Sequence, residues 1–407
     1  MLVFENTINR EPITSNVFNV INVPIINLHR FESLRKNSLS ELQSSSEKRK
    51  LLSNYRFSNE YFYVGIYEGI VENEKIFDEL KEQNYSFGIA EFEIMAGSFA
   101  VFEALGIKKT FNVAATVFFP KYLQLLEIDG EPIDVKKYIV PEFDSVEPGD
   151  WDKEKGISNK NSKRYRENLE KHKDANKKLI DEFDETDKLY EELYNKNVKN
   201  NKIDKPSKLN VLFKNINYHF INQHPLGILK DFPKLEDKIM YIGGIVVEKQ
   251  SILTKNKVDK HNLPRVVYAS LGSFRVSFYT KVFGEGVFEQ MIAEFQKHNE
   301  YIFKARFEER FLPKTSRNIV LTEKSVKQQN ILAKSNTKLF ISHCGLNGLN
   351  EAMYAGVPLI CVPRDVDQPY NASLIEHKGI GIYVKLDQNF ENAFKEALDK
   401  ILNKNYG

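Results

Sequence analysis

The sequence predicts an α/β protein with two domains, each built around a parallel sheet. The chain has 407 residues, 42% of them hydrophobic, which is enough for two cores. Short apolar runs alternate with helical patterns in both halves, as in consecutive strand–helix units. A polar, lysine-rich stretch separates the two alternating sets. We therefore expect an N-terminal domain over 1–244, a linker over 245–262 and a C-terminal domain over 263–407.

The N-terminal half begins the alternation. It predicts strands over 17–28, 86–90 and 110–117, and helices over 74–83 and 96–105. Gly106 follows the second helix as a natural C-cap. The segment 151–205 is dense in Lys, Glu and Asp, with sparse apolar pairs. It predicts exposed helices that cover or flank a cleft, and a solvated insertion without a role is an equal alternative.

The C-terminal half repeats the alternation more regularly. It predicts strands over 266–271, 301–305, 319–322, 338–343, 358–362 and 380–384, and helices over 283–298, 327–333, 347–355, 369–378 and 390–402. Strands that alternate with helices in this way form a parallel sheet.

Composition excludes several classes of function. Lys and Arg total 58 and Asp and Glu total 56, so the net charge of +2 gives no attraction to nucleic acid. No apolar run is long enough to span a bilayer, and residues 1–16 lack a signal-peptide core, so we expect a soluble, cytoplasmic chain. Cys344 and Cys361 are expected to be unpaired, buried apolar residues, and nothing indicates a metal site.

The sequence KLFISHCGLNGLNEAMYAG combines a strand, a glycine turn and a helix. His343 ends the strand, Gly345 and Gly348 allow a tight turn, and the helix opens near Asn347. Free N–H groups at a helix N-terminus suit a phosphate, and His343 can add a donor. Glu351 lies one turn further along the same face and can accept two ribose hydroxyls.

The next strand brings further polar groups to the same sheet edge. Asp367 and Gln368 follow it, and Asn371 lies one turn later. Acceptors and donors at this spacing suit the vicinal hydroxyls of a sugar. Taken singly, a strand-end His or an Asp–Gln pair is more commonly structural, and a strand–glycine–helix unit fits many nucleotide binders. Together, and in the order in which they occur along the chain, these residues indicate groups for a phosphate, a ribose and a sugar.

These residues resemble the UDP-glycosyltransferase family, of the animal glucuronosyltransferase and glucosyltransferase type. The resemblance is strongest over FISHCGLNGLNEAMYAGVPLICVPRDVDQ, residues 340–368, where only Arg364 departs from the family pattern. Weaker similarity covers 87–107, 232–245 and the SLGS sequence at 270–273. The resemblance implies the GT-B arrangement, in which two Rossmann-like domains face each other across a cleft. The donor would lie in the C-terminal domain and the acceptor in the N-terminal one, which looks incomplete.

The resemblance also implies roles for individual residues. By this resemblance the donor would be a UDP-sugar co-substrate and the acceptor a small lipophilic molecule, and no other cofactor and no metal are implied. The residues expected to hold the diphosphate are His343, Gly345, Asn347 and Gly348, with Ser273 lining the phosphate side, Glu351 at the ribose, Gln328 near the uridine, and Asp367 and Gln368 at the transferred sugar.

Several positions depart from the family. Ser325 replaces a tryptophan that stacks on uracil, and Lys327 replaces a proline. The family's catalytic histidine has no match before residue 17, and His29 is a poor candidate for it. Glu91 matches the acid that orients this base and is the only catalytic candidate. The chain therefore looks shortened at both ends.

We expect transfer of a hexosyl or glucuronosyl group to an acceptor hydroxyl. One alternative is a truncated or inactive member that binds the nucleotide-sugar without turnover, and another is a GT-B enzyme with a different nucleotide donor. The full-length gene product would reside at the endoplasmic reticulum membrane if it carries the family's signal and C-terminal anchor. The sequence leaves the oligomeric state, the acceptor and the sugar open.

Overall fold

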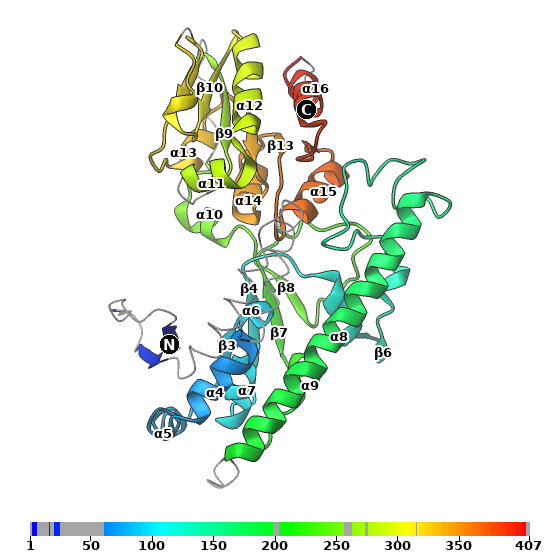
Figure 1. Cartoon of the computed structure of the whole chain (residues 1–407), viewed down its shortest axis with the longest axis vertical. Coiled ribbons are helices and arrows are strands. Elements are labelled where there is room, and N and C mark those ends of the chain that lie inside the picture. The colour runs from blue at the N-terminus through cyan, green and yellow to red at the C-terminus, as the bar shows by residue number, and fades with distance from the viewer. Residues whose placement is uncertain are drawn as a thin grey trace.

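The protein forms two lobes, each with its own parallel sheet (Figure 1). The computed structural model describes residues 2–5, 16, 20–24, 61–197, 203–255, 263–272, 276–314 and 316–403. The predicted α/β class with two parallel sheets is confirmed. Within the described ranges, no helix combines the length and the apolar character that crossing a bilayer requires.

The C-terminal lobe contains a six-stranded sheet in the order β11-β10-β9-β12-β13-β14, in which all pairs are parallel. Its strands are β9 (Arg265–Ser270), β10 (Tyr301–Ala305), β11 (Ile319–Leu321), β12 (Thr337–Ser342), β13 (Leu359–Cys361) and β14 (Gly381–Tyr383). Its helices are α11 (Val276–Phe283), α12 (Glu285–Lys297), α13 (Gln328–Leu332), α14 (Leu346–Ala355), α15 (Gln368–Lys378) and α16 (Phe390–Asn403). The short η5 (Glu309–Phe311) follows β10. The helix predicted over 283–298 is α12, and α11, which precedes it, had not been predicted.

The strand register of this sheet brings three loops to one edge. Ser342 at the end of β12 pairs with Ser270 of β9 and with Cys361 of β13. The chain leaves all three strands at the same level, and α14 and α15 begin beyond that level. The carboxyl edge of a parallel sheet is where open α/β folds bind ligands.

The N-terminal lobe contains a four-stranded parallel sheet in the order β3-β4-β7-β8. Its strands are β3 (Gly88–Ala90), β4 (Thr110–Ala114), β7 (Tyr218–Ile221) and β8 (Ile239–Tyr241). The helical elements are η1 (Tyr61–Gly65), α4 (Ile66–Val71), α5 (Glu74–Glu82), α6 (Phe92–Met95), α7 (Gly97–Ala104), η2 (Pro120–Leu125), η3 (Val135–Lys137), α8 (Lys163–Asn197) and α9 (Leu209–Lys214).

Two small strand pairs lie outside the main sheets. β1 (Leu2–Glu5) pairs in parallel with β2 (Ile21–Pro24), and β5 (Glu127–Ile128) forms a hairpin with β6 (Glu131–Pro132). β2 is the described part of the strand predicted over 17–28. The predicted linker over 245–262 begins as helix α10 (Ile245–Gln250), and its residues 256–262 lie outside the described residues.

The predicted exposed helices over 151–205 are in fact one long helix, α8, preceded by a turn-rich loop (Figure 1). The helix is not simply solvated, because Leu179, Phe183, Tyr190 and Leu193 are buried in the core of the N-terminal lobe. Their spacing of three, four and seven residues places them on one face. The Tyr190 hydroxyl also donates to the Tyr63 carbonyl at 2.8 Å. The sparse apolar pairs are therefore a packing stripe.

Apolar packing joins the two lobes. One core runs from the N-terminal sheet to the face of the C-terminal sheet that carries α14 and α15. A second core fills the other face of the C-terminal sheet, under α12 and α16. There Phe295 stacks on Phe303 with ring centroids 4.3 Å apart. The helices that border the carboxyl edge of the C-terminal sheet, α14 and α15, therefore pack on both lobes.

The two cysteines form a disulfide, so the prediction of unpaired cysteines is wrong. Cys344 and Cys361 are fully buried, and their Cα atoms lie 5.4 Å apart. Cys361 pairs with Ser342 in the sheet, and Cys344 lies two residues beyond Ser342. The pairing depends on the register of β12 against β13, which single-strand patterns do not reveal.

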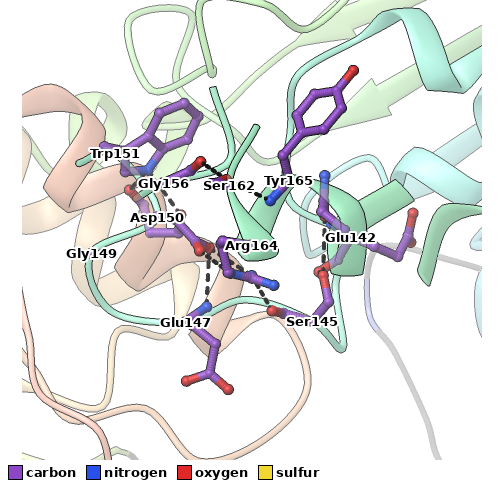
Figure 2. A network of polar contacts seen from close by, with 12 residues as sticks. Glu142, Ser145, Glu147, Gly149, Asp150, Trp151, Gly156, Ser162, Arg164 and Tyr165 are labelled. Carbon is purple, nitrogen blue, oxygen red and sulfur yellow. Dashed lines mark hydrogen bonds and ion pairs between the residues drawn. The ribbon is translucent and has the colours of Figure 1, made fainter. Parts of the chain in front are cut away.

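A loop of the N-terminal lobe holds α15 through hydrogen bonds. The Trp151 indole N–H donates to the Ser373 carbonyl at 2.9 Å and to its hydroxyl at 3.0 Å. The Gly149 N–H donates to the Glu376 carboxylate at 3.0 Å. Figure 2 shows the support of this loop, where Arg164 pairs with the buried Asp150. Because Asp367 and Gln368 lie where α15 begins, this loop helps to fix their place.

Replacing Trp151 with phenylalanine tests the contact between the loop and α15. An aromatic ring is kept, but the indole N–H and part of the packed ring area are lost, so we expect the free energy of unfolding to fall by about 1 kcal/mol or more. The denaturation midpoint in urea, followed by circular dichroism, measures this change. Ser373→Ala, which keeps the carbonyl acceptor, should have a smaller effect. An unchanged midpoint in Trp151→Phe would contradict the contact.

Candidate functional site

The coil between β12 and α14 forms the centre of the candidate site. Gly345 is the N-cap of α14, and its carbonyl accepts from the Leu349 N–H at 3.1 Å. A Cβ atom at Gly345 would lie only 2.8 Å from Nε2 of His343, so a side chain there would collide with the imidazole. Glycine is therefore required for His343 and the first turn of the helix to lie together. The N–H groups of that turn form an anion-binding end.

Burial keeps the His343 side chain neutral. It lowers the pKa of His343 to about 4, far below the usual value. At neutral pH the ring is therefore a hydrogen-bonding group without a charge. Positive potential at this end of α14 then comes from the helix dipole and not from the imidazole.

Glu351, one turn into α14, is held by two amide side chains. Gln328 donates to one carboxylate oxygen at 2.6 Å and Gln329 to the other at 3.0 Å. Gln328 also lies beside Gly348, 3.6 Å from where a Cβ atom would be. The structure thus brings together Gln328, Gly348 and Glu351. Their individual roles stay predictions.

Asp367 lies at the start of α15 and faces the start of α14. Its carboxylate is buried and accepts from Asn371 Nδ2 at 2.9 Å. Burial raises the pKa of Asp367 to about 6, while Asn371 and the N–H of Leu346 partly oppose the increase. Asn371 also donates to the Cys344 carbonyl at 2.9 Å, which ties α15 to the turn before α14. The predicted sugar and phosphate regions are therefore adjacent.

Gln368 and Arg364 shape the loop before α15. The Gln368 side-chain oxygen accepts from the N–H groups of Arg364 at 3.0 Å and Asp365 at 3.3 Å. Arg364 pairs with the Asp365 carboxylate at 3.0 Å and lies over the Phe283 ring. The oxygen of Gln368 is thus engaged by the backbone, and Arg364 already has an acidic partner.

Glu91 occupies the corresponding edge of the N-terminal sheet. It follows β3 directly, and its carboxylate accepts from the Ala115 N–H at 3.3 Å. Burial raises the pKa of Glu91, since desolvation penalises the charged form. The Ala115 carbonyl accepts from Asn222, which also contacts α14. A continuous set of hydrogen bonds therefore runs from Glu91 to the helix that carries Asn347.

Some predicted positions remain without a structural account, and some contacts had not been predicted. Ser273 and His29 lie outside the described residues. Ser325 is exposed in the coil before α13, so it presents no ring to a base. Sequence reasoning missed Gln329 and Asn222. Asn222 directly follows a buried strand at the carboxyl edge of a sheet, and that position was an available signal. No group of acidic, His or Cys side chains within the described residues could hold a metal ion.

Comparison with known proteins shows the family to which the chain belongs. A family model described as "UDP-glucoronosyl and UDP-glucosyl transferase" matches residues 177–407. UDP-glycosyltransferase UGT5 of Dactylopius coccus is 31% identical over 164 residues, which cover 40% of this chain and 30% of that protein. Cyanidin-3-O-glucoside 2-O-glucuronosyltransferase of Bellis perennis is 44% identical over 77 residues, which cover 19% and 18%. The chain thus matches less than a third of either relative's length.

Solved structures support the fold. Os79 from O. sativa in complex with UDP superposes with a TM-score of 0.52 at 15% identity, over 97% of this chain and 82% of that one. The glycotransferase of kitacinnamycin gives a TM-score of 0.51 at 12% identity, over 84% and 73%. These similarities show that the chain has the GT-B arrangement of two α/β domains.

The raised pKa of Asp367 makes a prediction about stability without ligand. Because the folded-state pKa lies above the usual 3.8, this group stabilises the fold below pH 4, and the contribution is lost as pH rises through about 6. Asp367→Asn, which cannot ionise, should therefore be more stable than the wild type at pH 7 by roughly 3 kcal/mol.

Urea unfolding from pH 4 to 7.5 checks this expectation, and the difference should vanish toward pH 4. Asp237→Asn makes the same change at an exposed aspartate and should leave stability nearly unaltered at every pH. A difference between wild type and Asp367→Asn that does not depend on pH would contradict the assigned burial.

Proposed function

Because this chain belongs to the UDP-glucoronosyl and UDP-glucosyl transferase family, we propose that it transfers a hexosyl group from a UDP-sugar to a hydroxyl of a small lipophilic acceptor. The relative from Bellis perennis is named for glucuronosyl transfer to a cyanidin glucoside, and this supports a small acceptor. No cofactor beyond the UDP-sugar co-substrate enters the proposal.

One observation carries the proposal: three kinds of group that suit the parts of a sugar-nucleotide lie around one helix end. The N–H groups that open α14 can bind the diphosphate. Glu351 one turn later, held by Gln328 and Gln329, can accept the ribose hydroxyls. Asp367, beside Leu346, can accept hydroxyls of the transferred sugar. In the donor the diphosphate lies between the ribose and the sugar, and the opening turn of α14 is likewise flanked by Glu351 further along the helix and by Asp367 beside Leu346.

The proposed transfer requires a leaving group and a proton acceptor. The acceptor oxygen bonds to the anomeric carbon as the bond from that carbon to the diphosphate oxygen breaks, and UDP leaves with the electron pair. The amide N–H groups of α14 stabilise the charge that develops on UDP. The acceptor hydroxyl proton passes to a base. We assign Glu91 either to orient that base or to accept the proton itself, since its raised pKa suits proton transfer.

We propose a neutral hexose in preference to a glucuronate. A glucuronate carboxylate needs a cationic partner near Asp367 and Gln368, and Arg364 is the nearest candidate in sequence. Arg364 is already paired with Asp365 at 3.0 Å. Recruiting it would leave that carboxylate, whose pKa burial already raises, without its partner.

Glycoside formation tests the proposed transfer directly. Purified protein incubated with UDP-glucose or UDP-glucuronate and a panel of phenols should release UDP and form a glycoside that mass spectrometry detects. Glu351→Gln removes a carboxylate that accepts two hydroxyls, so we expect donor kcat/KM to fall by about tenfold or more. Glu396→Gln makes the same exchange at an exposed site on α16 and should leave kcat/KM unchanged.

Sugar transfer, the identity of the sugar and donor binding can each be contradicted by a different result. UDP binding without product from any acceptor would contradict transfer and support a protein that binds without turnover. Glucuronate transfer that is faster than glucose transfer, and that is lost in Arg364→Ala, would contradict the neutral hexose. A protein that binds no UDP would contradict the donor site itself.

Base recognition is proposed to be weak, because Ser325 offers no stacking surface. Introducing the ring with Ser325→Trp should tighten UDP binding by about fivefold or more. Calorimetry measures the change, and Lys324→Trp, at the preceding exposed position, is the control. UDP and other nucleoside diphosphates should compete at similar concentrations in the wild type. Strong selectivity for UDP without the ring would show that other residues read the base.

A further inference from the structure

We propose that Asn222 is a positioning residue that orients the Asn347 side chain so that its amide group donates to the diphosphate of the donor. Asn222 belongs to the N-terminal lobe, and Asn347 lies in the first turn of α14. The inference deepens the proposed function and rests on it. Neither the motif nor the family resemblance pointed to Asn222.

The contacts of Asn222 join the two lobes. It follows β7 directly, and its N–H donates to the Ala114 carbonyl at 3.1 Å, which continues the ladder with β4. Its side-chain Nδ2 donates to the Ala115 carbonyl at 3.1 Å and to Oδ1 of Asn347 at 2.9 Å. Its own carbonyl accepts from Nδ2 of the buried Asn350 at 2.9 Å. One residue therefore holds α14 through both its side chain and its backbone.

The backbone contact fixes the orientation of both amide side chains. The Ala115 carbonyl can only accept, so the Asn222 side chain must turn its Nδ2 toward it. The same Nδ2 then faces Asn347, which must present its oxygen. The NH₂ group of Asn347 is thereby directed away from Asn222. The orientation of both amides thus follows from a backbone partner that cannot donate.

This orientation matters because phosphate oxygens only accept hydrogen bonds. An Asn347 side chain that presents NH₂ to the opening turn of α14 adds a donor to the N–H groups there. The opposite rotamer would place a carbonyl oxygen against the anion and would repel it. Asn222 therefore selects the rotamer that can bind, before the ligand arrives.

The contact between Asn222 and Asn347 can be removed without changing the hydrogen bond of Glu91 on the acceptor side. Ala115 makes the two contacts through separate backbone groups. Its carbonyl accepts from the Asn222 side chain, and its N–H donates to the Glu91 carboxylate at 3.3 Å. Losing the Asn222 side chain leaves the N–H bond to Glu91 in place. Donor binding should therefore respond to a change at Asn222, while acceptor binding should not.

A double-mutant cycle with Asn347 tests the proposal. Asn222→Ala should raise the Kd for UDP, measured by calorimetry, by about fivefold, and should raise the donor KM by a similar factor with an unchanged acceptor KM. In protein that already carries Asn347→Ala, the same change should alter the Kd by less than about twofold. Asn336→Ala removes a comparable amide that donates to the Pro264 carbonyl at 2.7 Å and should leave the Kd unchanged.

Two outcomes of this cycle would overturn the proposal. An unchanged Kd in Asn222→Ala shows that Asn222 does not prepare the site. An equal loss with and without Asn347 shows a general effect on the fold. If Asn222→Ala does not fold, the cycle uses the isosteric Asn222→Asp, whose carboxylate cannot donate. A loss of UDP affinity caused only by repulsion between this carboxylate and the diphosphate would persist in protein that carries Asn347→Ala. Wild-type protein that binds no UDP would contradict the proposed function. Wild-type protein that binds UDP, with an unchanged Kd in Asn222→Ala, would contradict only the role of Asn222.

Discussion

The junction between β12 and α14 is the constraint on which the rest of the site depends. A helix that begins at the carboxyl edge of a parallel sheet has first N–H groups without intrahelical partners, and these point out of the sheet. Gly345 makes the tight approach to His343 possible, and the register of β12 with β9 and β13 brings the flanking loops to the same level. Shifting this junction would separate Asp367 from Leu346 and Glu351 from Gln328.

The site is held from both lobes, and this explains several contacts that the motif alone does not require. Asn222 holds the start of α14 from the N-terminal sheet. Trp151 holds the middle of α15 from the loop before α8. Polar groups inside the site have lost part of their hydration, which lowers the pKa of His343 and raises that of Asp367. Burial of the charged Asp367 carboxylate therefore costs stability at neutral pH.

The sequence was most informative where local pattern and packing coincide. The strand over 301–305 has the predicted bounds, and α14 begins one residue before its predicted start, because buried parallel strands are apolar throughout and glycine ends the helix. Helical spacing placed Glu351 on the same face as Asn347, whereas Gln328 was assigned to the donor site from the family resemblance alone. The disulfide, the buried face of α8 and the role of Asn222 could not be predicted in this way, since each depends on which distant elements lie side by side.

Hydrogen–deuterium exchange with UDP and with uridine tests the central claim most directly. If the N–H groups that open α14 bind the diphosphate, UDP should slow exchange over residues 345–350, and uridine, which lacks the phosphates, should not. Equal protection of this segment by uridine, or protection by UDP only elsewhere in the chain, would contradict the account.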